Sequence, residues 1–277
     1  MKASHKTLPA GRQAKISVIM SVYNGMPYLK EAVGSILNQT HENFEFIIVD
    51  DASKDKSWSY LNSLKDKRIK LIKNKKNIGL AASLNKTLTK ATGDYIARMD
   101  ADDISLTKRF EKQIEFLLKN PSIDLCGTWA YLIDNTGNVI GEKKFYTNDQ
   151  MIKRALAIYS PIIHPTYLAK KNFFKKLHGY DKKFEYAEDY EILLRAKKDF
   201  KFANLPMRLF KWRLWDRRRS RAEMEKIDRA DFRVKLTGFK KGYFGKQYLS
   251  IVILKFFVTF LTPYFLKKAV AKKIKLA

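Results

Sequence analysis

The sequence predicts an α/β fold with a mostly parallel central sheet that is flanked by helices. Short apolar runs rich in β-branched residues alternate with segments whose apolar residues recur every three or four positions. This alternation is typical of βαβ units, which build parallel sheets. Polar or acidic residues directly follow three of the apolar runs. Because ligands of parallel sheets bind beyond the carboxyl ends of the strands, these residues predict a binding site at that edge.

The first half of the chain contains four predicted strands with helices between them. The strands are expected at residues 16–22, 44–49, 69–72 and 95–99. The helices are expected at residues 27–37, 55–66 and 80–93. Pro27 suits the first turn of its helix because that position needs no N–H donor. Ser53 is a candidate N-cap of the second helix.

The second half continues with helices and a different strand arrangement. Helices are predicted at residues 107–119, 148–158 and from 188 onward. Strands are predicted within 123–140, around a turn at 135–138, and at 200–205. Residues 162–168 are expected to be extended, because Pro165 disfavours the helical conformation at His164.

Composition sets limits on partners and compartment. The 277 residues allow one large domain or two small ones, and 55 Lys and Arg against 28 Asp and Glu give a net charge of +27. Such a surface favours nucleic acid, anionic lipid or phosphorylated substrates. The single cysteine, Cys126, is expected in the core and fits a reducing cytoplasm. No secretory signal precedes Lys15, and residues 1–14 are predicted to be a flexible lead-in.

The C-terminal part, residues 206–277, is predicted to be a basic extension with an apolar helix over about 248–266. Residues 205–277 hold 20 Lys and Arg against 5 Asp and Glu. Lys255 near the middle and Pro263 near the end argue against a membrane-spanning helix. Four alternatives remain open: an interfacial helix on anionic lipid, a homodimer interface, a helix docked on the catalytic domain, and a membrane-spanning helix.

One acidic stretch, residues 93–103, follows the fourth predicted strand. Its carboxylates Asp100, Asp102 and Asp103 lie within four residues, where a bound cation relieves their repulsion. Mg²⁺ and Mn²⁺ take such oxygen ligands together with substrate phosphates. The alternative is a solvated acidic turn that starts the next helix, with Asp103 as a helix cap. No Gly-x-Gly-x-x-Gly or P-loop pattern occurs, which argues against a dinucleotide-binding fold and an NTPase.

Five short motifs in this order carry a resemblance to a known family. They are Ser17–Gly25, Val49–Ser53, Asn77–Gly79, Gly93–Asp103 and Ala187–Glu191. Together they resemble family 2 glycosyltransferases of the GT-A fold, over about residues 15–205. The resemblance implies a nucleotide-sugar half at about 15–103 and an acceptor half at about 104–205.

The activity that the resemblance implies is inverting transfer of a sugar, assisted by Mn²⁺ or Mg²⁺. The donor would be a nucleoside diphosphate sugar, with UDP as the expected nucleotide, and the acceptor a hydroxyl of a glycan or lipid-linked sugar. This suits bacterial surface polysaccharide or lipopolysaccharide synthesis on the cytoplasmic face of the membrane. Nucleic acid is not the expected partner, because charge alone supports it.

The family's functional residues carry over onto matching positions of this sequence. Those implied to contact the nucleotide sugar are Tyr23, Asn24, Asp50, Asp51, Asn77, Gly79, Arg98 and Asp100. Asp102 is the implied metal ligand, with Asp100 beside it. Asp189 is the implied catalytic base, with Glu188 as the second choice. For each group an ordinary structural role as a turn, a helix cap or a charge at a helix start is the alternative.

Some features leave the assignment open. His164 is a candidate contact of acceptor or diphosphate, although a single histidine is more often structural. Trp212-Arg213 is a loose match to the family's aromatic and basic motif after the last strand, and the cluster at 217–221 could bind phosphate or a lipid head group. Two alternative functions are a nucleotidyltransferase of related fold and a non-enzymatic protein that binds nucleic acid or membrane.

Overall fold

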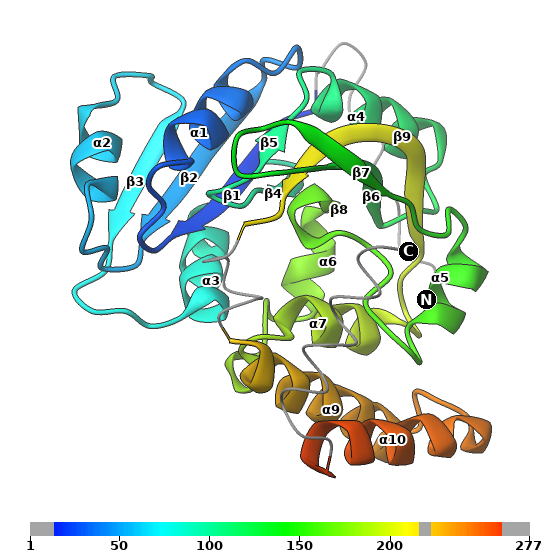
Figure 1. Cartoon of the computed structure of the whole chain (residues 1–277). Coiled ribbons are helices and arrows are strands. Elements are labelled where there is room, and N and C mark those ends of the chain that lie inside the picture. Colours follow the sequence, from blue (N-terminus) through cyan, green and yellow to red (C-terminus); the bar gives the residue numbers. More distant parts are fainter. Residues whose placement is uncertain (1–13, 216–222, 262–277) are drawn as a thin grey trace.

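A computed structural model describes residues 14–215 and 223–261 of the chain (Figure 1). The described strands form one nine-stranded sheet of order β3-β2-β1-β4-β8-β6-β9-β5, with β7 paired to β6. Its first four strands run parallel to one another, as predicted. They are β1 (Ile16–Val22), β2 (Phe44–Asp50), β3 (Ile69–Lys73) and β4 (Tyr95–Arg98).

Helices cover both faces of this parallel part. Alternate residues of β1 point to opposite faces: Val18 and Met20 join the core under α1 (Leu29–Leu37), and Ile19 joins the core under α3 (Leu80–Lys90). The helix α2 (Ser57–Ser63) precedes β3. Burial on both faces explains why the strands read as nearly continuous apolar runs.

The second half of the sheet is mixed. The strand β8 runs antiparallel to both β4 and β6 and so joins the two halves, while β9 runs parallel to β6. The strands of this half are β5 (Ile104–Ser105), β6 (Leu125–Ile133), β7 (Val139–Lys143), β8 (Leu168–Lys170) and β9 (Phe202–Arg213). Its helices are α4 (Arg109–Lys119), α5 (Asp149–Ala155), α6 (Lys171–Lys176) and α7 (Glu188–Ala196).

Some local predictions are wrong. Pro27 does not lie in the first turn of a helix, because α1 begins at Leu29. Residues 162–168 are not extended throughout, because His164–Thr166 forms a 3₁₀ turn, η1. The turn is held by α4, whose Gln113 side chain donates to the Thr166 carbonyl and whose Arg109 donates to the Pro165 carbonyl. Ser53 does not cap α2. Its hydroxyl accepts a hydrogen bond from the Asn24 N–H instead.

The C-terminal part forms a helical layer against α7. The long helix α9 (Met224–Lys240) packs on α7, and a 3₁₀ turn, η3 (Lys246–Tyr248), leads into α10 (Leu249–Phe256). The apolar segment continues as a π-helix, η4 (Phe257–Leu261), and α10 lies on the outer side of α9 (Figure 1). The rest of the predicted apolar helix, residues 262–266, and the basic cluster at 217–221 lie outside the described residues.

The part of the chain that the structure describes contains no helix with the length and apolar character needed to cross a membrane. The boundary expected at residue 205 falls inside β9, which continues to Arg213. Cys126 is fully buried in β6, as predicted for a core residue.

Candidate active site

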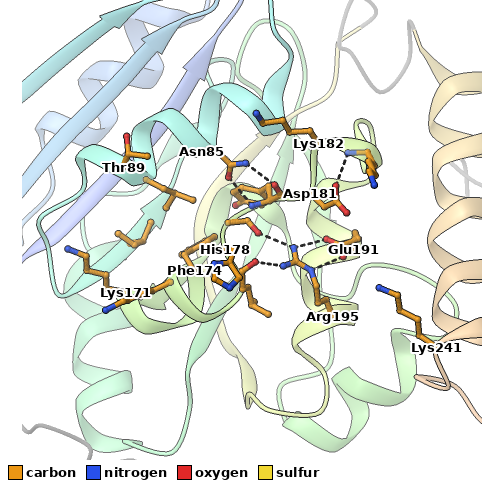
Figure 2. Close-up of a pocket in the computed structure, with 17 residues that line it drawn as sticks. Asn85, Thr89, Lys171, Phe174, His178, Asp181, Lys182, Glu191, Arg195 and Lys241 are labelled. Carbon is orange, nitrogen blue, oxygen red and sulfur yellow. Dashed lines mark hydrogen bonds and ion pairs between the residues drawn. The ribbon is translucent and has the colours of Figure 1, made fainter.

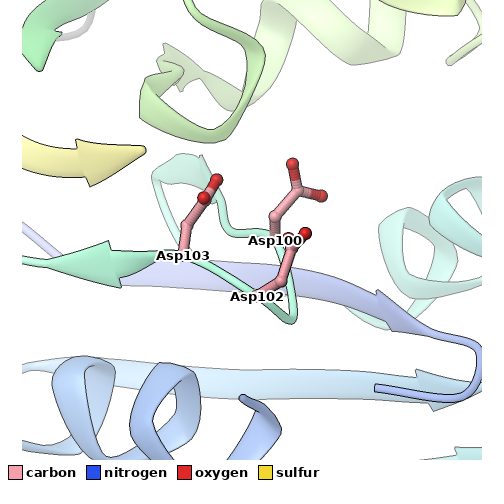
Figure 3. A group of neighbouring side chains, drawn as sticks. All are labelled: Asp100, Asp102 and Asp103. Atoms are coloured by element: carbon pink, nitrogen blue, oxygen red, sulfur yellow. The ribbon is translucent and has the colours of Figure 1, made fainter. Parts of the chain in front are cut away.

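The acidic stretch forms a turn directly after β4. Oxygen atoms of Asp100, Asp102 and Asp103 all lie within 4.8 Å of one another, and Figure 3 shows the three carboxylates on the same side of the loop. Arg98, the last residue of β4, forms an ion pair with Asp100. One buried cation therefore balances part of the charge of three clustered carboxylates.

Arg98 connects this acidic turn to the second acidic motif. Its side chain is 2% exposed, and its Nε and Nη1 have no hydrogen-bond partner among the described residues. Burial opposes its charge, but Asp100, Tyr180 and Glu188 more than compensate and raise the pKa of Arg98. Buried guanidinium donors without partners suit an anionic group such as a phosphate.

The second acidic motif opens α7, as predicted. Glu188 is buried and Asp189 is half-buried in the first turn of the helix. Burial raises the pKa of the Asp189 carboxyl, and hydrogen bonds and the charge of Arg98 offset this only in part. A carboxylate with a raised pKa is better matched to accept a proton near neutral pH.

Tyr180 lies between the two acidic motifs. Its hydroxyl is hydrogen-bonded to His164 Nε2 at 2.8 Å, and burial raises the pKa of this tyrosine. The charges that act on its hydroxyl come from both motifs and from the arginine between them: Arg98, Glu188, Asp189 and Asp100. The fold therefore brings together carboxylates that lie almost ninety residues apart in the sequence.

His164 is part of an aromatic group beneath the site. Its ring packs edge-on against Tyr167 and Tyr180, with centroids 5.0 and 5.4 Å away. The Tyr167 hydroxyl donates to the Asp189 carbonyl at 3.4 Å. His164 thus supports the residues around the second acidic motif, and a contact with substrate stays a prediction.

Residues at the end of β9 and directly after it form hydrogen bonds with the acidic turn. The Arg213 N–H donates to Asp103 Oδ1 at 2.8 Å, and its Nε donates to the Asp102 carbonyl at 2.9 Å. The indole N–H of Trp215 donates to Asp102 Oδ2 at 2.9 Å. The proposed helix cap at Asp103 is wrong, because α4 begins at Arg109 without a side-chain cap and Asp103 binds β9 instead.

Arg213 is itself fixed by α1 and by the hairpin loop after β6. Its side chain, 1% exposed, forms an ion pair with Glu31 and donates to the carbonyls of Asp134 and Asn135 at 3.2 and 3.3 Å. The guanidinium also lies 4.3 Å from the ring centre of Tyr28, which packs edge-on against Trp215. These contacts fix Arg213 in place, and Arg213 in turn stabilises the conformation of the acidic turn, which is the candidate metal site.

The carboxyl end of β2 carries the next pair of predicted site residues. Asp50 is fully buried, and its Oδ1 has no hydrogen-bond partner in the described part of the chain. Asp51 accepts hydrogen bonds from the Asn74 side chain and from the N–H groups of Ile78 and Gly79. Asp51 therefore holds the turn beside the predicted nucleotide pocket, and its direct contact with the nucleotide stays a prediction.

The loop after β1 lies against the loop after β2. Asn24 has φ of 52° and its side-chain oxygen accepts from the Lys54 N–H at 2.8 Å, while Tyr23 is exposed. The hydrogen bond from the Asn24 N–H to Ser53 adds a second link. The two predicted nucleoside-contacting loops are thus fixed to each other.

Asn77 and Gly79 form the third loop of this edge. The Asn77 side chain accepts from the Gly79 N–H at 3.1 Å, and Glu185 accepts from the N–H of Leu80 at 2.9 Å. Gly79 has φ of 87° and ψ of 165°, a conformation that is essentially restricted to glycine. A Cβ at this position would lie 2.9 Å from a Glu185 carboxylate oxygen.

We expect Gly79→Ala to destabilise the protein more than Gly137→Ala. Gly137 also has positive φ, at 94°, but a Cβ there would meet no atom within 4 Å. Backbone strain costs about 1–3 kcal/mol at either position, and only Gly79→Ala adds a clash. Thermal unfolding of both variants tests this. Equal melting temperatures would show that the contact with Glu185 does not constrain the loop.

The sequence did not indicate several residues that complete the site. Tyr180, Trp215 and Glu185 lie on loops without a periodic pattern, so only their places in the fold reveal them. Arg213 did have a signal in the sequence, the loose match of Trp212-Arg213 to the family's motif, although both residues lie in β9 and not in a loop after the last strand.

A cavity of about 900 Å³ lies between α3, α6 and α7 (Figure 2), and Tyr180 is one of its lining residues. Its wall includes Arg195, which is paired with Glu191 and donates to the Gly179 carbonyl. Neither the acidic turn nor Asp189 contributes to its lining. The cavity therefore shares Tyr180 with the candidate active site but contains neither the metal-binding candidates nor the candidate base.

Comparison with known families decides the class of the protein. The model of "Glycosyl transferase family 2" matches residues 17–178, which is more than half of the 277 residues. The chain belongs to this family. As a family 2 glycosyltransferase it is an enzyme, and the transferase prediction is confirmed.

Curated relatives agree with this assignment. A protein of Methanocaldococcus jannaschii, named uncharacterized glycosyltransferase MJ1057, is 36% identical over 266 residues and covers 91% of each chain. The O-antigen biosynthesis glycosyltransferase WbnJ of Escherichia coli is 38% identical over 186 residues, which are 65% of this chain and 70% of WbnJ. The relatives thus include enzymes of bacterial surface glycan synthesis.

Solved structures confirm the GT-A glycosyltransferase fold. TarS of S. aureus in complex with UDP-GlcNAc has a TM-score of 0.65 at 18% identity, covering 88% of this chain and 72% of TarS. The mannosyltransferase PcManGT of Pyrobaculum calidifontis in complex with GDP-Man and Mn²⁺ has a TM-score of 0.64 at 18% identity. This match covers 90% of this chain and 70% of PcManGT.

Proposed function

We propose that this family 2 glycosyltransferase transfers a sugar, with inversion, from a nucleoside diphosphate sugar to an acceptor hydroxyl of a surface polysaccharide or lipopolysaccharide. The observation that carries the proposal is the meeting of two acidic motifs around Arg98. Asp100 is in an ion pair with Arg98, and Arg98 in turn acts on the pKa of Asp189. The metal-binding candidate Asp100 and the base candidate Asp189 therefore both interact electrostatically with the same buried arginine.

The acidic turn fits a divalent cation. Its three carboxylates offer hard oxygen ligands close together, which Mg²⁺ and Mn²⁺ prefer. Asp102 and Asp100 would hold the ion, and Arg213 and Trp215 would keep the turn in place. The bound ion would supply Lewis-acid stabilisation of the departing diphosphate. PcManGT, whose complex contains GDP-Man and Mn²⁺, supports this choice.

The nucleotide would bind beyond the carboxyl ends of β1, β2 and β4. Asp50 Oδ1, which has no hydrogen-bond partner among the described residues, is a suitable acceptor for an N–H or hydroxyl group of the nucleoside. The unpaired Arg98 donors would bind a phosphate oxygen. Tyr23, Asn24 and the turn at residues 77–79 would form the walls of the pocket. TarS, which binds UDP-GlcNAc, supports a UDP-linked donor.

Asp189 would act as the base. As the acceptor oxygen forms its bond to the anomeric carbon, the carboxylate takes the hydroxyl proton, and the carbon–phosphate-oxygen bond breaks on the opposite face. The electron pair leaves with the diphosphate, so the configuration at the anomeric carbon inverts. The neighbouring Glu188 would help to keep Arg98 protonated, because its negative charge raises the pKa of this arginine. Family membership and this arrangement favour the transferase over the nucleotidyltransferase and over a non-enzymatic binder.

A thermal-shift experiment tests donor and metal together. Wild-type protein is melted with UDP, GDP, dTDP or CMP, each with and without Mn²⁺. At a hundredfold excess over Kd a ligand stabilises by about 2.7 kcal/mol, or roughly 5 °C or more for a chain of this size. We expect one nucleotide to give this shift only with Mn²⁺, and Asp102→Ala to lose it.

The matched control is Asp199→Ala, because Asp199 is an exposed acid remote from the turn. It should keep the full shift. A metal-independent shift that survives in Asp102→Ala would contradict the proposed metal site. Absence of a shift with all four nucleotides would contradict binding of the donor before the acceptor.

A further inference from the structure

The helix α10 and its continuation η4 direct their one charged side chain toward α9 and leave most of their large apolar side chains exposed. The side chains turned toward α9 are Val252, Lys255 and Thr259. The opposite side carries large apolar residues, with Leu254 64% exposed and Leu261 62% exposed. The other exposed apolar residues of this segment are Leu249, Ile253, Phe256, Phe257, Val258 and Phe260. A helix with this orientation is not suited to contact with water.

The contacts with α9 fix this orientation. Lys255 forms ion pairs with Asp228 at 3.0 Å and with Asp231 at 2.9 Å, so the one charge of α10 is directed into the helix pair. The ring of Phe232 packs against Phe256 and Phe260 with centroids 5.8 and 5.3 Å away. Lys255 therefore does not interrupt the outer apolar face, although it interrupts the apolar sequence.

The chain after Asp231 carries charged side chains of only one sign. Residues 232–277 contain 11 Lys and Arg and no Asp or Glu. Of these cations, Arg233, Lys240 and Lys241 are exposed on or next to α9. Arg233 lies over the ring of Phe184, and Lys241 lines the cavity between α3, α6 and α7. An exposed apolar face within a basic, acid-free part of the chain is complementary to a lipid surface, which is apolar inside and carries anionic head groups at its boundary.

A second copy of the chain fits less well. A two-fold dimer brings the same patch of both subunits together, so each acid-free segment would lie against its own copy. The like charges would repel, whereas the anionic head groups of a lipid surface would attract them.

We propose that the outward face of α10 and η4 docks in the interface of an anionic lipid membrane. The apolar side chains would enter the boundary of the acyl chains, and lysines and arginines of the acid-free segment would contact the head groups. This inference is independent of the transfer chemistry, because none of its residues belongs to the candidate active site.

Vesicle co-sedimentation of the full chain tests the proposal. The probes are phosphatidylcholine vesicles with and without phosphatidylglycerol, at about 0.1 M and about 1 M salt. We expect binding only to the anionic vesicles, and weaker binding at high salt. The double variant Leu254→Ser/Phe257→Ser should bind at least about tenfold more weakly, because two large apolar side chains no longer enter the membrane.

The control is Val139→Ser/Ile140→Ser, which removes two equally exposed apolar residues from β7. It should bind as the wild type does. Wild-type affinity of the α10 variant would overturn the proposal, as would equal binding to neutral vesicles. Light scattering adds a third test, the oligomeric state. If the wild type is a dimer that does not bind vesicles, and the double variant Leu254→Ser/Phe257→Ser is a monomer, the apolar face binds a second copy of the chain and the proposal is wrong.

Discussion

Asp189→Asn is expected to lower kcat by about a thousandfold, because general bases typically contribute 10²- to 10⁴-fold. The amide has nearly the same shape as the carboxylate but cannot take the acceptor proton. Nucleotide affinity should stay the same, since Asp189 lies at the start of α7 and not in the predicted nucleotide pocket. Initial rates at saturating donor and acceptor, together with nucleotide-dependent melting, separate the two effects.

The pH dependence of the wild type gives a second measure of the same residue. Burial raises the pKa of Asp189, and only the ionised form accepts a proton. The rate should therefore rise with pH through a midpoint above the usual carboxyl range, and Asp189→Asn should lose this limb. Asp199→Asn is the control and should keep both rate and profile. If Asp189→Asn keeps a tenth of the activity and Glu188→Gln does not, the roles of the two residues are exchanged.

Arg213→Ala is expected to have the largest effect on stability. The change leaves the Asp102 carbonyl and the hairpin carbonyls without their buried donor and removes the partner of Glu31. Breaking a buried set of this kind costs about 3 kcal/mol or more, which lowers Tm by roughly 10 °C. The turn that carries Asp102 loses its support as well, so the Mn²⁺-dependent nucleotide shift should shrink.

Arg208→Ala is the matched control for this variant. Arg208 lies on the same strand and also pairs with a glutamate, Glu142, but its side chain is 30% exposed. Its replacement should change Tm by less than about 2 °C. Equal effects of the two variants would show that the burial of Arg213 and its hydrogen bonds to the acidic turn contribute little.

The parallel half of the fold was predictable because its strands are buried on both faces. Their apolar runs are therefore nearly uninterrupted, and β1 was located to the residue. The turn at His164 was not predictable from local preference. Its carbonyls are satisfied by Arg109 and Gln113 of α4, more than fifty residues away, and this tertiary contact overrides the extended preference before Pro165.

In the candidate site, too, short sequence motifs were predictable and contacts between distant segments were not. The residues of the acidic turn and the pair at the start of α7 stand in recognisable order in the sequence. Their common neighbour Tyr180 and the closing contacts of Arg213 and Trp215 depend on strand order, which a single sequence does not specify. Lys255 is the clearest case: in the sequence it interrupts an apolar helix, and in the fold two aspartates of α9 pair with it.

The course of β9 has a consequence for fragments of this enzyme. The strand pairs with β6 along Leu125–Ile133 and with β5 near the acidic turn. A fragment ending at residue 205, the predicted limit of the catalytic domain, would leave the edge of β6 from Trp129 to Ile133 without its partner strand. Such an open edge invites pairing between molecules. Shortened forms of the protein should therefore extend past Trp215, since earlier termination would produce aggregates instead of a smaller enzyme.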